Sequence, residues 1–132
     1  MDSFVAHRNT VKFLQGDYVR RSLTDNIGNV TAVKRISDTM TSAGRKLSSH
    51  TMENFISALT LSYIFYDVTR YDVKGMANLK TGHKYYLADS GLHSIIICTK
   101  TGDLRHILEN VVYLELRRRY REVYVGKVGE AE

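Results

Sequence analysis

The sequence predicts a mixed α+β fold, and three patterns along the chain carry that prediction. Apolar residues recur at spacings of three and four between residues 24 and 63, as they do in helices that bury one face. Aromatic and β-branched residues then gather in 63–73, and a second tyrosine-containing run follows a glycine-containing turn at 84–88, which is typical of a β-hairpin. Helical spacing returns over 104–119 and is followed by alternating valines.

The composition is that of one folded domain or two small subdomains. Of 132 residues, 43% are hydrophobic and 25% are charged, which argues against disorder. The longest purely apolar run covers only residues 95–98, far below the roughly 20 residues that a membrane span needs. No secretion signal opens the chain, and its one cysteine, Cys98, cannot form an intramolecular disulfide. We therefore expect a soluble cytoplasmic domain with no membrane partner.

The first half of the chain is expected to be helical. The first twenty residues carry an irregular apolar set that predicts one short helix. A second helix is expected to be capped by Thr24 or Asp25 and to end at Gly44, with a buried face of Ile27, Val30, Val33, Ile36 and Met40. A third helix follows the capping residues 48–49, with a face of Met52, Phe55, Ile56, Leu59 and Tyr63.

The next segment changes to a strand pattern. Residues 63–73 predict one strand, glycine-containing turns follow, and residues 84–88 predict the returning strand. Two helices joined by the short turn 44–47 form a helix-turn-helix candidate. With the hairpin after them they have the order of a winged helix, in which the hairpin is the wing. We assign residues 1–88 to a winged-helix-like domain with an N-terminal helical lead-in.

Residues 89–132 predict the beginning of a second, α/β unit. The Asp-Ser-Gly segment 89–91 can cap a short helix through Ile97, and strong helical spacing covers Leu104 to Arg119. Three arginines close that helix, where positive charge is favourable. Residues 122–128 alternate in the manner of a strand. One helix and one strand make a poor core, so we expect this unit to be incomplete.

Several blocks, in one order along almost the whole chain, resemble a known family. They are DNIGN (25–29), GRKLSSHTMENFISAL (44–59), RYDVKG (70–75), LKTGHKYYLADSGL (79–92), LENVVYLELRRR (108–119) and EVYVGKVG (122–129). These blocks are similar to the C-terminal region of bacterial and archaeal AAA-type ATPases that carry a domain of unknown function after the motor. The resemblance implies a winged helix leading into a restriction-endonuclease-like domain. The ATPase would lie before Met1 and the rest of the nuclease-like sheet after Glu132.

The residues present do not assemble an enzyme site. A phosphate-binding loop needs two glycines, a lysine and a hydroxyl, and the nearest segments, 74–75 and 126–128, lack the second glycine and the hydroxyl. No cofactor is therefore expected in this chain, and ATP and magnesium are implied only for the ATPase domain. By resemblance, Glu109 occupies the helical acid position of the nuclease-like family, but one carboxylate cannot hold a catalytic metal. The competing interpretation is an ordinary helix surface, on which Glu115 pairs with the arginines three and four residues later.

The charge permits a nucleic-acid partner, since the formal net charge is +5 and the pI is near 9.4. The expected recognition helix, within residues 49–63, contains no lysine or arginine, which makes it poorly suited to reading bases. Basic and polar groups on and around it are candidates for phosphate contacts that do not read sequence: Arg45, Lys46, His50, Asn54, Lys74, Lys80 and Lys84.

We therefore expect a non-catalytic regulatory or interaction region of a AAA-type ATPase. Its partner would be the parent ATPase domain or another protein. The alternatives are a sequence-nonspecific DNA-binding winged helix and the remnant of a metal-dependent nuclease-like domain. An exposed strand edge at 122–128 also makes a homodimer a candidate state.

Overall fold

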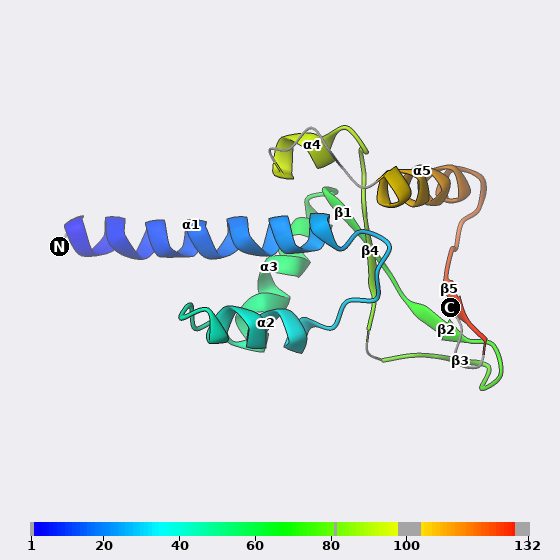
Figure 1. Ribbon diagram of the computed structural model, residues 1–132, viewed down its shortest axis with the longest axis horizontal. Helices are drawn as coiled ribbons and strands as arrows, with labels where there is room; N and C mark the ends of the chain where they lie inside the picture. The colour runs from blue at the N-terminus through cyan, green and yellow to red at the C-terminus, as the bar shows by residue number, and fades with distance from the viewer. Residues whose placement is uncertain (1, 81, 98–103, 129–132) are drawn as a thin grey trace.

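The computed structural model describes residues 2–80, 82–97 and 104–128 (Figure 1). Its elements follow in the order α1 (Asp2–Asp25), α2 (Val33–Ser42), α3 (Ser49–Leu61), β1 (Phe65–Val68), β2 (Arg70–Asp72), β3 (Ala77–Asn78), β4 (Lys84–Leu87), α4 (Leu92–Ile97), α5 (Leu104–Arg119) and β5 (Val125–Lys127). The helices and two small sheets within these ranges confirm the predicted α+β class. No helix in the same ranges is long and apolar enough to cross a membrane.

The first helix is longer than predicted, and the second begins later. α1 runs for 24 residues instead of forming one short helix, and its N-terminal turns extend beyond the other elements (Figure 1). The predicted caps Thr24 and Asp25 therefore lie inside α1, and α2 begins only at Val33. The spacing concealed this break because buried Ile27, in the loop between the helices, continues the apolar period of α1. Gly28, with a φ of +73°, adopts the left-handed conformation that turns the chain out of the helix.

The turn between α2 and α3 agrees with its prediction. Gly44, with a φ of +79°, comes directly after the C-cap of α2. Ser48 caps α3, because its hydroxyl accepts a backbone N–H of the first turn at 3.2 Å. Met52 and Ile56 are buried, as expected. The assignment of Tyr63 to the buried face was wrong: α3 ends two residues earlier, and Tyr63 is exposed with a φ of +57°.

The predicted hairpin forms between β1 and β4, which pair antiparallel with Phe65 opposite Leu87. The expected single strand over 63–73 is interrupted at Thr69, which separates β1 from β2. Beyond that point β2 belongs to another sheet, in which it pairs antiparallel with β3. The connection between the two hairpin strands therefore carries its own pair of short strands.

Two pairings join segments that are distant in the sequence. β5 spans three residues, fewer than the predicted 122–128, and pairs parallel with β2. Thr31, in the loop before α2, forms an antiparallel bridge with His83 at the start of β4, with N···O distances of 2.8 and 3.1 Å. β4 therefore has β1 on one side and the Thr31 bridge on the other.

The core lies where α1, α2 and α3 meet the hairpin. Its largest fully buried side chains are Phe65, Leu23, Ile27, Met40, Met52, Leu87, Val19 and Val68. The later helices pack onto the same body: α4 lies against α1, and α5 lies against β4 (Figure 1). α5 has the bounds that the sequence predicted.

A buried amide fixes α5 to the hairpin. Asn110, which is 1% exposed, accepts the Leu87 backbone N–H at 2.7 Å and donates to the Leu87 carbonyl at 3.0 Å. The ring of Tyr113 stacks on Tyr86, with centroids 4.2 Å apart and planes 11° from parallel. One side of α5 is therefore held tightly against β4.

Candidate functional site

The predicted basic phosphate contacts are dispersed over the molecule. Arg45 and Lys46 are exposed in the turn between α2 and α3, whereas Lys74 is exposed in the turn between β2 and β3 and Lys80 follows β3. Figure 1 shows the α2–α3 turn and the β2–β3 turn on opposite sides of the β1–β4 hairpin. The structure therefore does not gather these four cations into one patch.

The two predicted polar contacts lie on the exposed side of α3. Asn54 Nδ2 lies 3.5 Å from His50 Nε2, one helical turn away. Glu53 is exposed on the same helix, which has no lysine or arginine along its length. This face can form hydrogen bonds, but its only full charge is negative.

Lys84 and Glu109 form an internal ion pair. The Lys84 ammonium lies 3.2 Å from Glu109 Oε1, and the Tyr86 hydroxyl donates to the same oxygen at 2.8 Å. Burial, followed by this bond to a carboxylate, raises the pKa of Tyr86. A Cβ on Gly28 would lie 2.5 Å from the Glu109 carboxyl group, so the loop before α2 needs glycine there. Both predicted site residues therefore contribute to holding α5, β4 and this loop together.

The expected surface pairing on α5 is confirmed. Glu115 Oε1 lies 2.8 Å from Arg118 Nη2 and 2.6 Å from Arg119 Nε. Hydrogen bonds from Arg118 and then Arg119 lower the pKa of Glu115 to about 2. These side chains are exposed, so the pairing is a feature of the helix surface.

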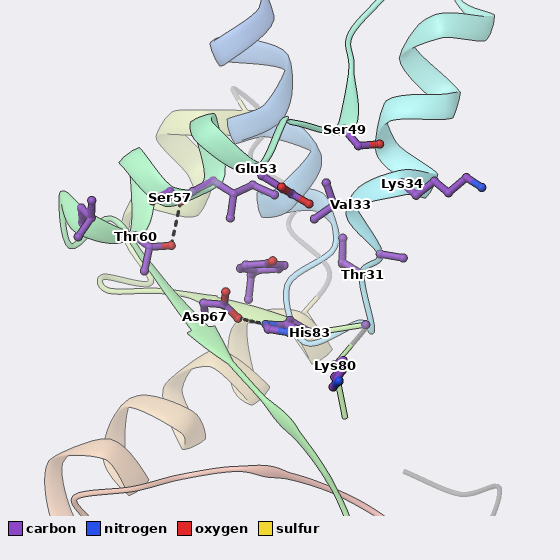
Figure 2. A pocket seen from close by; sticks show the side chains of 15 residues that line it. Thr31, Val33, Lys34, Ser49, Glu53, Ser57, Thr60, Asp67, Lys80 and His83 are labelled. Carbon is purple, nitrogen blue, oxygen red and sulfur yellow. Dashed lines mark hydrogen bonds and ion pairs between the residues drawn. The ribbon is translucent and has the colours of Figure 1, made fainter. Parts of the chain in front are cut away.

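A groove that the sequence analysis missed lies between α3, the start of α2 and the hairpin. Its volume is about 570 Å³, and its lining includes the charged residues Lys34, Glu53, Asp67 and Lys80 together with His83. Figure 2 shows Glu53 on one side of the groove and Asp67 and His83 on the other. A hydrogen bond joins Asp67 Oδ1 and His83 Nδ1, as the dashed line in Figure 2 marks.

Tyr85 also lines this groove and is 3% exposed. Its ring stacks on the His83 ring, with centroids 6.4 Å apart and planes 22° from parallel. Burial raises the pKa of Tyr85, and the negative charges of Asp67 and then Glu53 raise it further. The phenol therefore stays protonated at neutral pH, and both carboxylates lie within electrostatic reach of it.

The hairpin register was the signal that could have revealed part of this groove. Asp67 lies directly opposite Tyr85 in the β1–β4 pair, and His83 lies two residues from Tyr85 along the same face. Glu53 comes from another element, and no local pattern places a helix residue over a particular strand. Pairing the predicted strands would therefore have brought together Asp67, His83 and Tyr85, but not Glu53.

A second feature is an uncovered apolar face on α5. Leu104, Leu108 and Val112 are 66%, 55% and 57% exposed, and they recur every four residues. Val111 and Leu116 extend the same face and are also exposed. The opposite side of α5, with Asn110 and Tyr113, is the one that packs on β4. We call the exposed set, Leu104, Leu108, Val111, Val112 and Leu116, the α5 stripe.

Within the described ranges, no group of three or more histidine, cysteine or acidic side chains is arranged to hold a metal ion. Cys98 lies outside those ranges. Within the described residues, the groove and the α5 stripe are therefore two candidate contact surfaces of this α+β domain.

Comparison with known proteins places the chain in a family. Residues 4–101 match the family described as a domain of unknown function (DUF8612), and the chain belongs to this family. It is also 36% identical over 132 residues to an uncharacterised protein of Haemophilus influenzae, an alignment that covers 97% of this chain and 32% of that protein. The chain thus spans about a third of the length of that relative. No solved structure matches.

Proposed function

We propose that this chain is a winged-helix module that acts by contacting protein, as the non-catalytic regulatory or interaction region of a AAA-type ATPase. The element order supports the winged helix: three helices, with the Thr31 bridge between the first two, lead into the β1–β4 hairpin. The three strand segments run Thr31, β4, β1 across the sheet. The β1–β4 hairpin is the wing, and the connection between its strands forms the tip.

The observation that carries the protein-contacting role is the α5 stripe. Large contiguous apolar patches on the surface of a folded protein are characteristic of interaction sites. The family match ends at residue 101, ahead of α5, and the Haemophilus relative is about three times as long as the match. Both facts favour α5 and β5 as the beginning of a further unit. Its remaining, nuclease-like part would cover the stripe.

The open edge of β5 supports the same proposal. Among the described strands β5 pairs only with β2, so its other edge can accept a further strand. An additional strand there would extend the sheet of β3, β2 and β5.

The test uses the longer relative. The part of the Haemophilus protein outside the matching region is produced separately and mixed with this chain, and complex formation is measured by sedimentation velocity. We expect a complex that Leu108→Lys weakens at least tenfold, since the substitution puts a charge in the middle of the stripe. Leu61→Lys, at a leucine of α3 that is even more exposed than Leu108, is the control and should bind as the unchanged chain does. Absence of a complex, or equal effects of both substitutions, would refute the role of the stripe.

Sequence-nonspecific DNA contact is the second candidate, favoured by exposed Arg45, Lys46, Lys74 and Lys80 and by the net charge of +5. It ranks lower because these cations are dispersed and Lys84 is paired with Glu109. Fluorescence anisotropy with a labelled duplex at low and near-physiological salt tests it. Micromolar binding that collapses with salt, and that is lost on reversing Lys74 and Lys80, would establish phosphate contact.

A further inference from the structure

The small sheet of β3, β2 and β5 has one exposed face that carries two tyrosines. Tyr71 of β2 lies opposite Gly126 of β5 in the parallel pair. Side chains two residues apart along a strand point to the same side, so Tyr124 and Val128 share the side of Gly126, and Val73 shares that of Tyr71. Tyr124, Val73 and Val128 are 48%, 49% and 58% exposed. We call these five residues the tyrosine face.

The two tyrosine rings lie close together without covering each other. Their centroids are 6.2 Å apart and their planes are 50° from parallel, so the rings do not stack on one another. The Tyr124 hydroxyl donates to Glu122 Oε2 at 3.3 Å, which helps to hold that ring in place. A positioned and partly exposed aromatic ring can stack with a flat group from another molecule.

Gly126 leaves a gap beside the rings that the fold does not require. Its φ is not in the left-handed region, and a Cβ there would come within 4 Å only of Val73 Cγ2 among the described residues, at an ordinary contact distance of 3.8 Å. Glycine weakens the interior of a strand, because it has no side chain to pack and loses much conformational freedom on folding. A strand glycine with room for a side chain is typical of a place where another molecule approaches the backbone closely.

Cationic side chains lie at both ends of the tyrosine face. Four of the five residues at 117–121 are exposed arginines, and this segment leads into β5 (Figure 1). Lys74 is exposed in the turn at the other end, where Asp72, on the opposite side of β2, accepts its backbone N–H at 3.1 Å. Together with Glu115 and Glu122, the acids of this region number three against five cations. The surroundings are therefore positive and complement a chain of phosphates.

We infer that the tyrosine face binds single-stranded nucleic acid without sequence preference, with bases stacking on Tyr71 and Tyr124 and phosphates contacting Arg121 and Lys74. A single strand fits better than a duplex, because only unpaired bases present their flat sides to an aromatic ring. The inference does not depend on the α5 stripe or on the basic turn between α2 and α3. Failure of either proposed function therefore leaves it testable.

The first experiment titrates a fluorescein-labelled oligothymidylate of about a dozen nucleotides with the full chain at about 50 mM salt and follows anisotropy. We expect a dissociation constant on the order of 1–10 μM. A strand of abasic sites of the same length keeps the phosphates without the bases, and it should bind at least tenfold more weakly, as should a duplex of that length. Equal binding of the abasic strand or the duplex would overturn the inference. Absence of binding at this salt would also overturn it and would leave the face to a protein partner.

Two variants link the binding to the tyrosine face. Tyr124→Leu removes the ring but keeps apolar bulk and should weaken binding at least fivefold, whereas Tyr63→Leu, at an exposed tyrosine after α3, should change it less than twofold. Gly126→Val fills the gap and should weaken binding at least fivefold with an unchanged or higher melting temperature, since strands favour β-branched residues. Binding unaffected by both face variants would contradict the inference.

A third variant tests the phosphate contact. Arg121→Ser should make the dependence of log K on log salt shallower by about 0.7, the change expected when one phosphate contact to a single strand is lost. Arg45→Ser, at an exposed arginine of the turn between α2 and α3, should leave that slope unchanged. Equal slopes for the two variants would place the bound strand elsewhere and refute the assignment.

Discussion

A methyl group added at Gly28 tests the contact that joins α5 to the loop before α2. Gly28 and Gly44 both have positive φ, of +73° and +79°, but their surroundings differ. A Cβ at Gly44 would meet nothing within 4 Å, whereas one at Gly28 would lie 2.5 Å from the Glu109 carboxyl group. Gly28→Ala therefore combines backbone strain with displacement of Glu109, and Gly44→Ala causes the strain alone.

The expected magnitudes follow from these contacts. Left-handed strain costs about 1–2 kcal/mol, and the lower entropy of the unfolded alanine chain returns about half of that. Gly44→Ala should therefore lower the free energy of unfolding by about 1 kcal/mol. Displacing Glu109 also breaks its hydrogen bond from Tyr86 and leaves the Lys84 ammonium without its partner. A hydrogen bond to a charged group contributes about 1.5–3 kcal/mol, so Gly28→Ala should cost about 3 kcal/mol.

Thermal and urea unfolding of both variants measure the difference, which corresponds to a melting temperature about 6–10 °C lower for Gly28→Ala than for Gly44→Ala. Glu109→Ala supplies the other arm of a double-mutant cycle. Without the carboxylate, Gly28→Ala should cost only about 1 kcal/mol, which gives a coupling energy of about 2 kcal/mol. Equal losses for the two glycines, or no coupling with Glu109, would refute the reasoning.

Three further predictions concern the other contacts of the hairpin and α5. Asn110→Ala should lower the free energy of unfolding by about 3 kcal/mol in urea, because it leaves the buried Leu87 N–H and C=O unbonded, while Asn54→Ala on the exposed face of α3 should change it by less than about 0.5 kcal/mol. The folded-state pKa of Glu115 is about 2, below its ordinary value near 4.3, so its contribution to stability is present above about pH 5 and is lost as the pH falls toward 2. Urea midpoints of Glu115→Gln should therefore fall less steeply over that window than those of the unchanged chain, and parallel curves would argue against the pairing. Burial raises the folded-state pKa of three of the nine tyrosines, Tyr85, Tyr86 and Tyr113, above the ordinary value of about 10. The stability that they contribute is therefore present below about pH 10 and is lost as the pH rises further, and absorbance near 295 nm should show these three ionising at a higher pH than the other tyrosines.

Local patterns predicted the elements whose signals are local. α3 and α5 have regular apolar spacing, and Ser48 caps α3 through a bond within one turn. The boundary between α1 and α2 was missed because Ile27 preserves the helical period across a loop, where only the backbone conformation of Gly28 marks the break. Periodicity describes which residues face the core, and a loop residue can face the core as well as a helical one.

Contacts between distant segments could not be predicted in the same way. The parallel pairing of β2 with β5 places Arg70 beside Val125. The two residues are far apart in the sequence, so no local turn motif announces the pairing. Lys84 was predicted to contact phosphate, but its charge is balanced by Glu109, 25 residues away. The groove depends on Glu53 from a helix and Tyr85 from a strand, so neither residue carries a recognisable motif. A lysine in the sequence is a candidate phosphate contact only if the fold does not pair it with an acidic side chain, as it pairs Lys84 with Glu109.

β4 connects the two faces of the molecule mechanically. Asn110 binds both backbone groups of Leu87, so a shift of α5 must move the end of this strand or break two hydrogen bonds. Tyr85, which lines the groove, is only two residues away, roughly 7 Å along the strand. A molecule bound in the groove would therefore contact the same short length of β4 backbone that α5 holds from the other side. Binding in the groove and the position of α5 are coupled through residues 85–87.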